Sequence, residues 1–172
     1  MFNESKPHQS GGDLFQTLHF FFPSRYMFWS DWGDSAKIEK CAMNGDSTSR
    51  RVLVNRDIVW PNGLTIDYTE DRIWWVDARL GKVESTDLNG QDRKVTLRSW
   101  GVRSTFGITL FQDSIYLTKR SRGRRVLKIR KDGSGGIVRI ARHLYGPRGI
   151  VVYHQMRQPG ARGKYFCSSK RS

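Results

Sequence analysis

The chain has 172 residues, of which 37% are hydrophobic and 12% aromatic, and this composition allows one ordinary domain with a buried core and excludes disorder throughout. The formal net charge of +14 suggests nucleic-acid binding at first sight, but residues 112–172 hold sixteen Lys and Arg against two Asp, which accounts for all of it. The positive charge is therefore a local property of the last third of the chain and not a property of the fold.

Residues 1–25 match no other part of the chain. They lack the basic start and the small-residue cleavage site of a secretory signal, and their longest apolar run, at 18–23, is far shorter than the roughly 18 residues of a membrane span. We expect an unmatched and poorly ordered segment, and no signal peptide or transmembrane segment in this chain. The two cysteines, Cys41 and Cys167, leave one disulfide open as an alternative, and they form no metal-ligand pattern.

Three landmarks recur along the rest of the chain at a nearly constant interval. A hexapeptide centred on aromatic residues occurs at Tyr26–Asp31, Arg72–Asp77 and Ser114–Lys119, with offsets of 46 and 42 residues. Asn-Gly or Asp-Gly occurs at 44–45, 89–90 and 132–133, and Gly followed by a largely apolar tripeptide occurs at 63–66, 107–110 and 149–152. A period of 40 to 50 residues is typical of propellers and solenoids.

The middle copy of this repeat predicts four short strands. Residues 64–67 alternate between apolar and polar, residues 72–76 follow a polar turn, and residues 82–87 alternate again after a bend. Asn89-Gly90 favours a hairpin because both residues tolerate positive φ at low cost, and residues 93–97 complete the set. No helical period holds over about ten residues, so we predict an all-β protein whose units match propeller blades better than a sandwich.

The repeated residues have an architectural interpretation. Blades stack face to face, and bulky rings such as Trp29, Trp75 and Tyr116 can fill the widening space between neighbours. The Asp that follows the Trp is a short acceptor, suited to binding backbone N–H groups at a strand end and so to locking adjacent turns. The residues that we assign to the structural repeat are Trp29, Asp31, Asn62, Gly63, Trp75, Asp77, Asn89, Gly90 and Tyr116.

The tetrapeptides Phe28-Trp29-Ser30-Asp31, Trp74-Trp75-Val76-Asp77 and Tyr116-Leu117-Thr118-Lys119 resemble the YWTD repeat of low-density-lipoprotein-receptor-type proteins. Segments such as "WPNGLTID" and "KVESTDLNG" are similar to the same repeats in the large receptor-related members. The resemblance covers residues 26–159 and implies a partial six-bladed YWTD β-propeller, with about three blades of four antiparallel strands. Residues 160–172 would then form a basic C-terminal tail.

The resemblance also implies a location and a function. Similar proteins are receptor ectodomains at the plasma membrane, in which EGF-like modules flank the propeller. They bind extracellular protein ligands for endocytosis or act as co-receptors in signalling, Wnt signalling among them. A non-catalytic chain without cofactor or metal is implied, and the loop around Arg79 is one place where a ligand would dock.

The sequence departs from the family pattern in several places. Its length has room for about three of six blades, and the third copy has Leu117 and Lys119 in place of Trp and Asp. Residues 160–172 lack the cysteine pattern of an EGF-like module. We therefore interpret the chain as a fragment. Because an open stack exposes strand edges and blade faces, we expect the isolated chain to aggregate, or to be stable only when paired with another half.

A lactonase-like propeller hydrolase is the enzymatic alternative. Six-bladed lactonase-like enzymes also carry a Pro-Asn-Gly segment, whose Asn helps to hold a central metal, and Asn62 fits this description. The equivalent positions, 105–107 and 147–149, offer no carboxylate, and the four histidines follow no catalytic or metal-binding motif. We therefore favour the interpretation that Asn62-Gly63 shapes the entry to an inner strand.

The run "KRSRGRRVLKIRK", at 119–131, concentrates positive charge within the third copy. Such a cluster could hold sulfate or phosphate groups and give salt-sensitive binding of heparan sulfate or, less readily, of nucleic acid. It lacks stacking aromatics and has the apolar residues of a blade strand, so a solvated strand and turn is the leading interpretation. The candidate polyanion-binding residues are Lys119, Arg120, Arg122, Arg124, Arg125, Lys128, Arg130 and Lys131.

Overall fold

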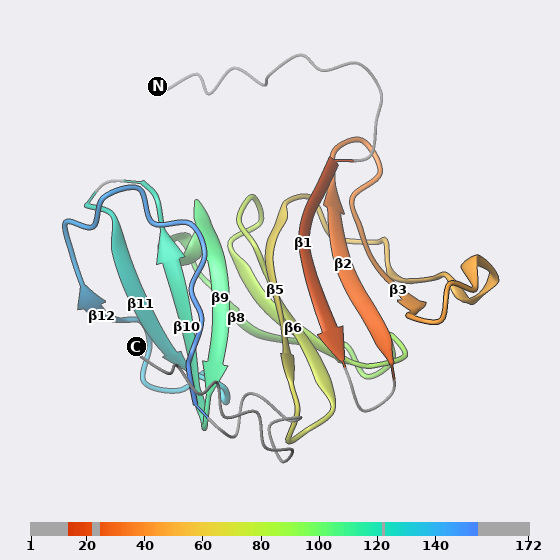
Figure 1. Cartoon of the computed structure of the whole chain (residues 1–172). Coiled ribbons are helices and arrows are strands. Elements are labelled where there is room, and N and C mark those ends of the chain that lie inside the picture. Colours follow the sequence, from red (N-terminus) through yellow and green to blue (C-terminus); the bar gives the residue numbers. More distant parts are fainter. Residues whose placement is uncertain (1–13, 22–24, 122, 155–172) are drawn as a thin grey trace, which may run out of the picture.

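The computed structural model describes residues 14–21, 25–121 and 123–154, and these residues form three four-stranded antiparallel sheets (Figure 1). Within each sheet the strands follow the order of the sequence, and we call the sheets blades 1, 2 and 3. Blade 1 consists of β1 (Leu14–Phe21), β2 (Tyr26–Trp32), β3 (Lys37–Ala42) and β4 (Arg51–Val54). Blade 2 consists of β5 (Pro61–Asp67), β6 (Arg72–Asp77), β7 (Lys82–Asp87) and β8 (Lys94–Arg98). Blade 3 consists of β9 (Thr105–Phe111), β10 (Ser114–Lys119), β11 (Arg125–Arg130) and β12 (Val138–Ala141).

The blades stand side by side with β1, β5 and β9 as neighbouring inner strands, which confirms the predicted all-β partial propeller. Among the described residues, the connections contain the short 3-10 helices η2 (Ser47–Ser49) and η3 (Trp100–Val102). No helix in the described part of the chain has the length and apolar character to cross a membrane. Residues 1–13 and 155–172 lie outside the described residues. The predicted C-terminal tail and the first part of the predicted N-terminal segment therefore remain predictions.

Blade 1 contains a strand that the repeat pattern did not predict. Residues 1–25 match no other copy, yet Leu14–Phe21 forms β1 and pairs antiparallel with β2, from Leu14 opposite Trp32 to Phe21 opposite Tyr26. The sequence of β1, LFQTLHFF, lacks the Gly that is the third residue of β5 and of β9, so a comparison of landmarks passes over it. Its aromatic and β-branched content was the available signal.

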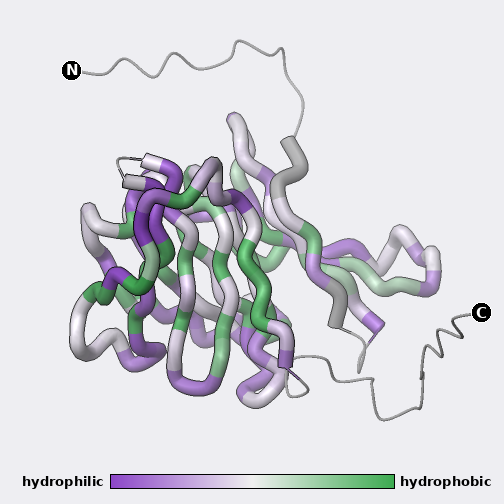
Figure 2. Tube along the Cα trace, turned by 60° about the vertical axis from the view of Figure 1, so that its left-hand side comes forward, coloured by the Kyte–Doolittle hydropathy of each residue, from purple (hydrophilic) through white to green (hydrophobic). Residues whose placement is uncertain are grey.

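The hydrophobic core lies between neighbouring blades and not within one sheet. Trp75 is fully buried and packs with Phe28 of blade 1, whereas Trp74 packs with Leu117 of blade 3. Adjacent residues of a strand point to opposite faces, so one Trp pair supplies a ring to each of two interfaces. Figure 2 shows the hydrophobic residues along the strands and the hydrophilic ones at many of the turns.

The inner strands of neighbouring blades approach each other closely at the repeated glycines. A Cβ atom on Gly63 would lie 2.5 Å from the carbonyl oxygen of Phe106, and one on Gly107 would lie 2.5 Å from that of Arg148. A Cβ on Gly149 would meet nothing within 4 Å. The first two glycines are therefore needed where one blade packs on the next.

The outer hairpins make a second close approach. Gly90 has φ +82° and a Cβ there would lie 2.7 Å from the carbonyl oxygen of Leu53 in the preceding blade. Gly133 has φ +76° and stands in the same relation to Thr96, at 2.5 Å. Gly45 has a similar φ of +85° but nothing within 4 Å. The Asn-Gly landmark thus serves both the turn and the packing of the hairpin on the outer strand of the preceding blade.

The third copy of the inner-strand landmark, at 149–152, is not a regular strand, but it lies along blade 3. The hydroxyl of Thr118 donates to the carbonyl of Arg148 at 2.5 Å, as the hydroxyl of Ser30 donates to the carbonyl of Pro61 at 2.8 Å. The rings of Phe111 and His154 meet edge to face, with centroids 4.9 Å apart. In blades 1 and 3, the Ser or Thr that precedes the position equivalent to Asp77 thus donates a hydrogen bond to the chain that follows the blade.

We predict that Gly90→Ala destabilises the protein more than Gly45→Ala. Both substitutions place a Cβ on a residue with positive φ, but only Gly90 faces backbone of a neighbouring blade. The difference between the two losses in free energy of unfolding, measured by urea titration, should be about 1–3 kcal/mol, the usual cost of overpacking. Equal losses would show that the hairpin contact between blades contributes nothing.

Candidate functional site

The connections between blades and the loops between second and third strands lie at one end of the sheets, and we call this end the loop face. The register places Pro61 opposite Asp77, and it places Lys82 opposite both Asp77 and Arg98, so these positions share one end of blade 2. The loop face comprises residues 33–36, 55–60, 78–81, 99–104, 120–121, 123–124 and 142–148.

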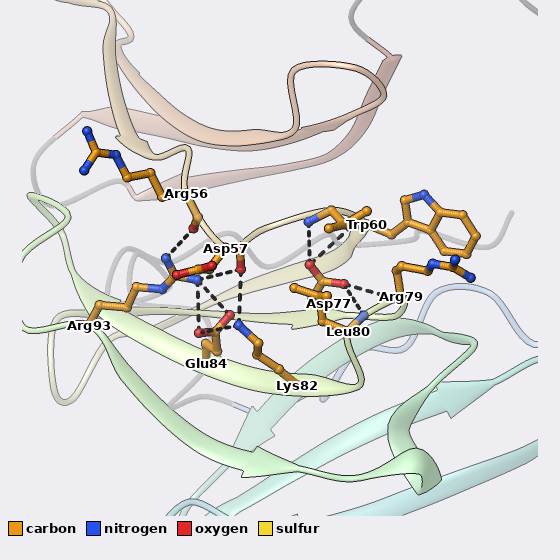
Figure 3. A network of polar contacts seen from close by, with 10 residues as sticks. Arg56, Asp57, Trp60, Asp77, Arg79, Leu80, Lys82, Glu84 and Arg93 are labelled. Carbon is orange, nitrogen blue, oxygen red and sulfur yellow. Dashed lines mark hydrogen bonds and ion pairs between the residues drawn. The ribbon is translucent and has the colours of Figure 1, made fainter.

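Asp77 fixes the loop face between blades 1 and 2. Its buried carboxylate accepts hydrogen bonds from the backbone N–H groups of Val59 and Trp60, at 2.7 and 3.3 Å. It also accepts from those of Arg79 and Leu80, at 3.0 and 2.9 Å. Figure 3 shows this carboxylate between the two loops. Asp77 therefore has the role that the sequence pattern predicts for it, and it positions the side chains of Trp60 and Arg79.

Backbone hydrogen bonds extend this order across the loop face. Ala78 N–H donates to the carbonyl of Trp60, Ser104 N–H to that of Ala78, and Arg120 N–H to that of Ser104. The donor–acceptor distances are 2.9, 3.3 and 3.2 Å. The loops of blades 2 and 3 are thus joined to each other, and the surface that they form is organised in advance of any ligand.

Arginine side chains lie over aromatic rings along this face. The Arg79 guanidinium is 5.4 Å from the ring centroid of Trp60, which meets Trp32 edge to face at 6.2 Å. Three more pairs follow, and these are Arg103 on Trp100 at 3.6 Å, Arg120 on Phe106 at 5.6 Å and Arg124 on Tyr145 at 5.6 Å. Trp100 is 77% exposed and Tyr145 is 97% exposed. The site thus presents stacked cations and rings, which the sequence did not predict, although it did suggest the loop around Arg79 as a docking place.

Blades 1 and 2 share an ionic layer next to their central Trp. Arg93 donates to both oxygens of Glu84 at 3.0 Å and lies 5.4 Å from the centroid of Trp75. Arg93 also donates to the carbonyl of Arg56 at 2.6 Å, so the pair ties blade 2 to the connection before it (Figure 3). In blade 1, Arg50 pairs with Glu39 beside Trp29, and here two guanidinium nitrogens donate to one carboxylate oxygen each, at 2.9 and 2.7 Å.

Blade 3 replaces this ionic layer with apolar side chains. Leu117 and Leu127 occupy the register positions of Trp75 and Glu84, and Ile137 packs against their cluster. Lys119 stands at the position of Asp77, and its Nζ donates to the carbonyl of Gly101 at 2.8 Å. Burial lowers the pKa of Lys119, and the charge of Arg125 lowers it further. The turn of blade 3 is therefore still tied to the connection before it, through a donor in place of an acceptor.

Asp31, the equivalent residue in blade 1, is buried near like charge. Burial raises its pKa first of all, and the Glu39 carboxylate raises it further, while Lys37 and a hydrogen bond from Trp29 oppose the rise. Trp29 and Tyr116 are half-buried, because each faces the side of its blade away from blade 2. Equivalent residues of the repeat thus lie at the same place in each blade, but the side chains around them differ.

The basic run of the third copy divides between the two ends of the blade. Arg120, Arg124 and Arg125 lie at the loop face, and Lys128 lies in the middle of β11. At the opposite end Arg130 pairs with Asp132 at 3.1 Å, and Lys131 pairs with Asp67 and Glu70 of blade 2. Arg122 lies outside the described residues. The eight candidates therefore do not form one polyanion site.

The structure adds two arginines that sequence reasoning missed. A hollow of about 160 Å³ at the loop face of blade 3 is lined by Gly123, Arg125, Arg139, Arg142 and His143. Arg139 reaches it because β12 pairs with β11, with a register shift at Val126 and Leu127. The surplus of Arg after residue 138 was the available signal, but the register that gathers it could not be predicted.

A larger cleft of about 500 Å³ lies between blades 2 and 3 at the end opposite the loop face. At the corresponding place between blades 1 and 2, Lys40 Nζ donates to the carbonyl of Leu88 at 2.8 Å and to the side-chain oxygen of Asn89 at 2.7 Å. Ser85 has the register position of Lys40 in blade 2 and is too short to do so. The cleft carries both signs of charge, since Glu70, Asp113 and Asp132 line it together with Arg72, Lys94, Arg130 and Lys131.

Asn62, the residue proposed for a lactonase-like metal site, links inner strands. Its amide donates to the carbonyl of Thr105 at 2.9 Å, and its own carbonyl accepts from the hydroxyl of Thr17 at 2.8 Å. Within the described residues no three His, Cys, Asp or Glu side chains lie where they could hold one metal ion. Cys41 is buried and free, and Cys167 lies outside the described residues.

Comparisons with known proteins point in one direction. The low-density lipoprotein receptor repeat class B family matches residues 25–68 and 71–112. The vitellogenin receptor of Solenopsis invicta is 39% identical over 90 residues, which are 52% of this chain and 5% of that protein. The vitellogenin receptor Yl of Drosophila melanogaster is 37% identical over 90 residues, with 52% and 4% covered. The human low-density lipoprotein receptor-related protein 5-like protein is 36% identical over 91 residues, with 53% and 35% covered.

Solved structures share the fold. The crystal structure of a nidogen/laminin complex superposes with a TM-score of 0.70 at 21% identity, covering 80% of this chain and 52% of that chain. The structure of a putative gluconolactonase superposes with a TM-score of 0.60 at 13% identity, covering 80% and 51%. At these identities the likeness shows the propeller fold alone. The chain spans about half of these structures and 35% or less of the three receptor relatives.

We predict that Lys131→Met destabilises the protein by about 2 kcal/mol at pH 7, because it leaves the buried Asp67 without its charged partner. Burial alone would raise the pKa of Asp67, but the bonds from Lys131 and Thr69 hold it below 3.8. A lowered acid pKa gives stability that is present above the unfolded value and is lost as the pH falls through the folded value. Urea titrations should therefore show the two proteins converging at acid pH. Arg130→Met, on a fully exposed pair, is the control and should change little.

Proposed function

Because the chain belongs to the low-density lipoprotein receptor class B repeat family, we propose that it is part of the ligand-binding propeller of an extracellular receptor and acts without catalysis. In the full-length protein EGF-like modules would flank the propeller, and the receptor would be anchored in the plasma membrane. Its role would be the uptake of extracellular protein ligands or co-receptor signalling. The receptor relatives support this proposal, since two of them are named as receptors for vitellogenin.

One observation carries the proposal, and it is the cluster of Trp32, Trp60 and Arg79 held in place by Asp77. Trp and Arg are enriched among the residues that dominate protein–protein binding energy. A side chain that is already ordered loses less conformational entropy on binding, so the Asp77 network favours affinity. The cluster thus combines the residue types and the order expected of a docking surface.

The charge of the loop face indicates an acidic ligand. The loop-face segments 78–81, 99–104, 120–121, 123–124 and 142–148 contain no Asp or Glu. Positive potential over such a surface would speed association with an acidic partner and would repel basic ones. We therefore propose that the protein ligand presents carboxylates or other anions to the Arg–aromatic pairs.

We predict that the chain binds vitellogenin, our probe ligand, and that Trp60→Ala or Arg79→Ala weakens this binding at least tenfold. The loss has the size expected for a residue at the centre of an interface. Biolayer interferometry with immobilised vitellogenin at low and high salt would measure it, with affinity falling as salt rises. Arg130→Ala, at the opposite end of blade 3, is the charge-matched control for Arg79→Ala. Absence of saturable binding, or equal losses in control and variants, would contradict the proposal.

Binding of a polyanion is the second candidate function, and a separate observation favours it. Arg120, Arg124 and Arg125 share one end of blade 3 with Arg139 and Arg142. A sulfated polysaccharide such as heparan sulfate fits an extracellular location, whereas nucleic acid does not. Retention of the chain on heparin until high salt would support this function.

A further inference from the structure

Residues 147–152 lie where the inner strand of a fourth blade would lie. A Cβ on Gly63 of β5 would lie 2.5 Å from the carbonyl oxygen of Phe106 in β9, and one on Gly107 of β9 would lie 2.5 Å from that of Arg148. Each of these inner strands thus packs on the one that follows it. Residues 147–152 therefore occupy the inner-strand place that follows blade 3.

This segment lacks the cover that the other inner strands have. β5 and β9 each pair antiparallel with the second strand of their blade, β6 or β10. Among the described residues, no strand pairs with residues 147–152. Val151 is 82% exposed, whereas Thr65 and Thr109, which also stand two residues after the repeated glycine, are 1% and 3% exposed. An open strand edge of this kind is a template for pairing with another chain.

The inner strand of blade 1 departs from the pattern of the others. Thr17 of β1 directly follows the register shift between β1 and β2, and Gly63 has this position in blade 2. The Thr17 hydroxyl donates to the carbonyl of Asn62, the residue before Gly63, at 2.8 Å. A side chain at this position keeps β1 farther from β5 than a glycine would allow. Residues 147–152 carry Gly149 at the same position, and a Cβ there would meet nothing within 4 Å, so they match the pattern that β1 lacks.

The free faces of blades 1 and 3 carry the two halves of a contact that joins blades 1 and 2. In that contact Lys40 Nζ donates to the carbonyl of Leu88 and to the side-chain oxygen of Asn89. Lys128 has the register position of Lys40 and lies on the face of blade 3 that points away from blade 2. Asn44 corresponds to Asn89 and lies in the hairpin of blade 1. Blade 3 thus offers the donor and blade 1 the acceptor.

The outer strands show a second match between the two faces. The hairpin glycines of blades 2 and 3 pack on the extra residue at the register shift of the preceding outer strand, which is Leu53 in β4 and Thr96 in β8. Ile140 is the extra residue in β12, and it is 50% exposed. Gly45, the hairpin glycine of blade 1, has nothing within 4 Å of a Cβ. The hairpin of blade 1 therefore fits the outer strand of blade 3, but the two lie at opposite ends of one chain (Figure 1).

We propose that two copies of this chain close one six-bladed ring, in which residues 147–154 of each copy replace β1 as the inner strand of blade 1 in the other. Tyr116 of one copy packs against Trp29 of the other, as Phe28 packs with Trp75 between blades 1 and 2. The chain spans 52% and 51% of two solved structures that share its fold, which leaves room for a second copy. Two identical head-to-tail contacts then close the ring with two-fold symmetry.

We predict that the purified chain forms a dimer of twice its mass of 19.9 kDa, measured by light scattering coupled to size-exclusion chromatography. Because the ring leaves no blade face free, larger species should not appear as the concentration rises. A monomer at all concentrations would overturn the proposal and leave both faces to blades of a different chain. A series of growing oligomers would overturn the closed ring, because head-to-tail contacts that do not close form filaments. The measurement needs no ligand, so its outcome is independent of the proposed receptor function.

Val151→Lys separates the interface from the fold of one chain. The side chain is exposed in one chain but buried in the ring, so the variant should dimerise at least about tenfold more weakly in sedimentation equilibrium. Circular dichroism should show unchanged β content. Val95→Lys adds the same charge at an exposed position outside the proposed contacts, and it should change the dissociation constant less than about threefold. Equal effects of the two variants would contradict the proposed place of residues 147–154.

A cysteine pair tests the exchange of strands. The register of β9 with β10 places Phe111 opposite Ser114, so Tyr153 of one copy should lie opposite Tyr26 of the other. Directly opposed residues of antiparallel strands are within reach of a disulfide. Tyr153→Cys/Tyr26→Cys should therefore form a covalent dimer with oxidised glutathione, seen on a non-reducing gel. A dimer without this cross-link would overturn the replacement of β1.

The matched control is Tyr145→Cys/Tyr26→Cys. Tyr145 is 97% exposed but lies at the loop face, whereas Tyr26 lies at the other end of its blade. This pair should stay uncross-linked. Both double variants carry Cys41→Ser and Cys167→Ser, so that the native thiols do not react. Equal cross-linking of the two pairs would show random collision and would count against the ring.

Discussion

The distance at which one blade packs on the next is set by backbone contacts that only glycine permits, and the rest of the structure depends on this distance. The interface between blades 2 and 3 has two such contacts, made by Gly63 between inner strands and by Gly133 between an outer hairpin and the preceding outer strand. Gly90 makes the hairpin contact between blades 1 and 2, and Gly107 makes the inner-strand contact between blade 3 and the chain that follows it. Where both contacts are present the spacing is fixed at both ends, and the buried rings between the blades have a wedge of constant width to fill. Cores of this kind tolerate little change in volume, which favours a repeat over independent solutions at each interface.

The same contacts explain which parts of the sequence predicted the fold. The glycines, the hairpin residues and the Trp positions recur because the interface demands them, so their period could be read without a structure. β1 could not be placed in this way, because its sequence has no glycine at the inner-strand position. The role of Asp77 was predictable from chemistry, since a short acceptor at a strand end has few other uses. The Arg–aromatic pairs were not predictable, because they depend on which loops the backbone hydrogen bonds from Trp60 to Arg120 bring together.

The faces of blades 1 and 3 that point away from blade 2 lack the contacts found between neighbouring blades. Gly45 and Gly149 have nothing within 4 Å, although they occupy the same repeat positions as Gly90 and Gly63. Trp29 and Tyr116 are half-buried where their counterparts in blade 2 are buried. These two faces carry the surface that a neighbouring blade covers elsewhere in the array, and this is why an isolated open stack is expected to associate.

The third blade illustrates how a repeat can change its charge without changing its architecture. In blades 1 and 2 a buried Glu pairs with an Arg, and in blade 2 this Arg also binds a carbonyl of the connection before the blade. Leu127 and Ile137 replace such a pair with apolar contact, and Lys119 replaces the carboxylate of Asp77 with a cation that satisfies a carbonyl instead. Both exchanges keep the blade in place, and the second puts a cation at the loop face where blades 1 and 2 have an Asp.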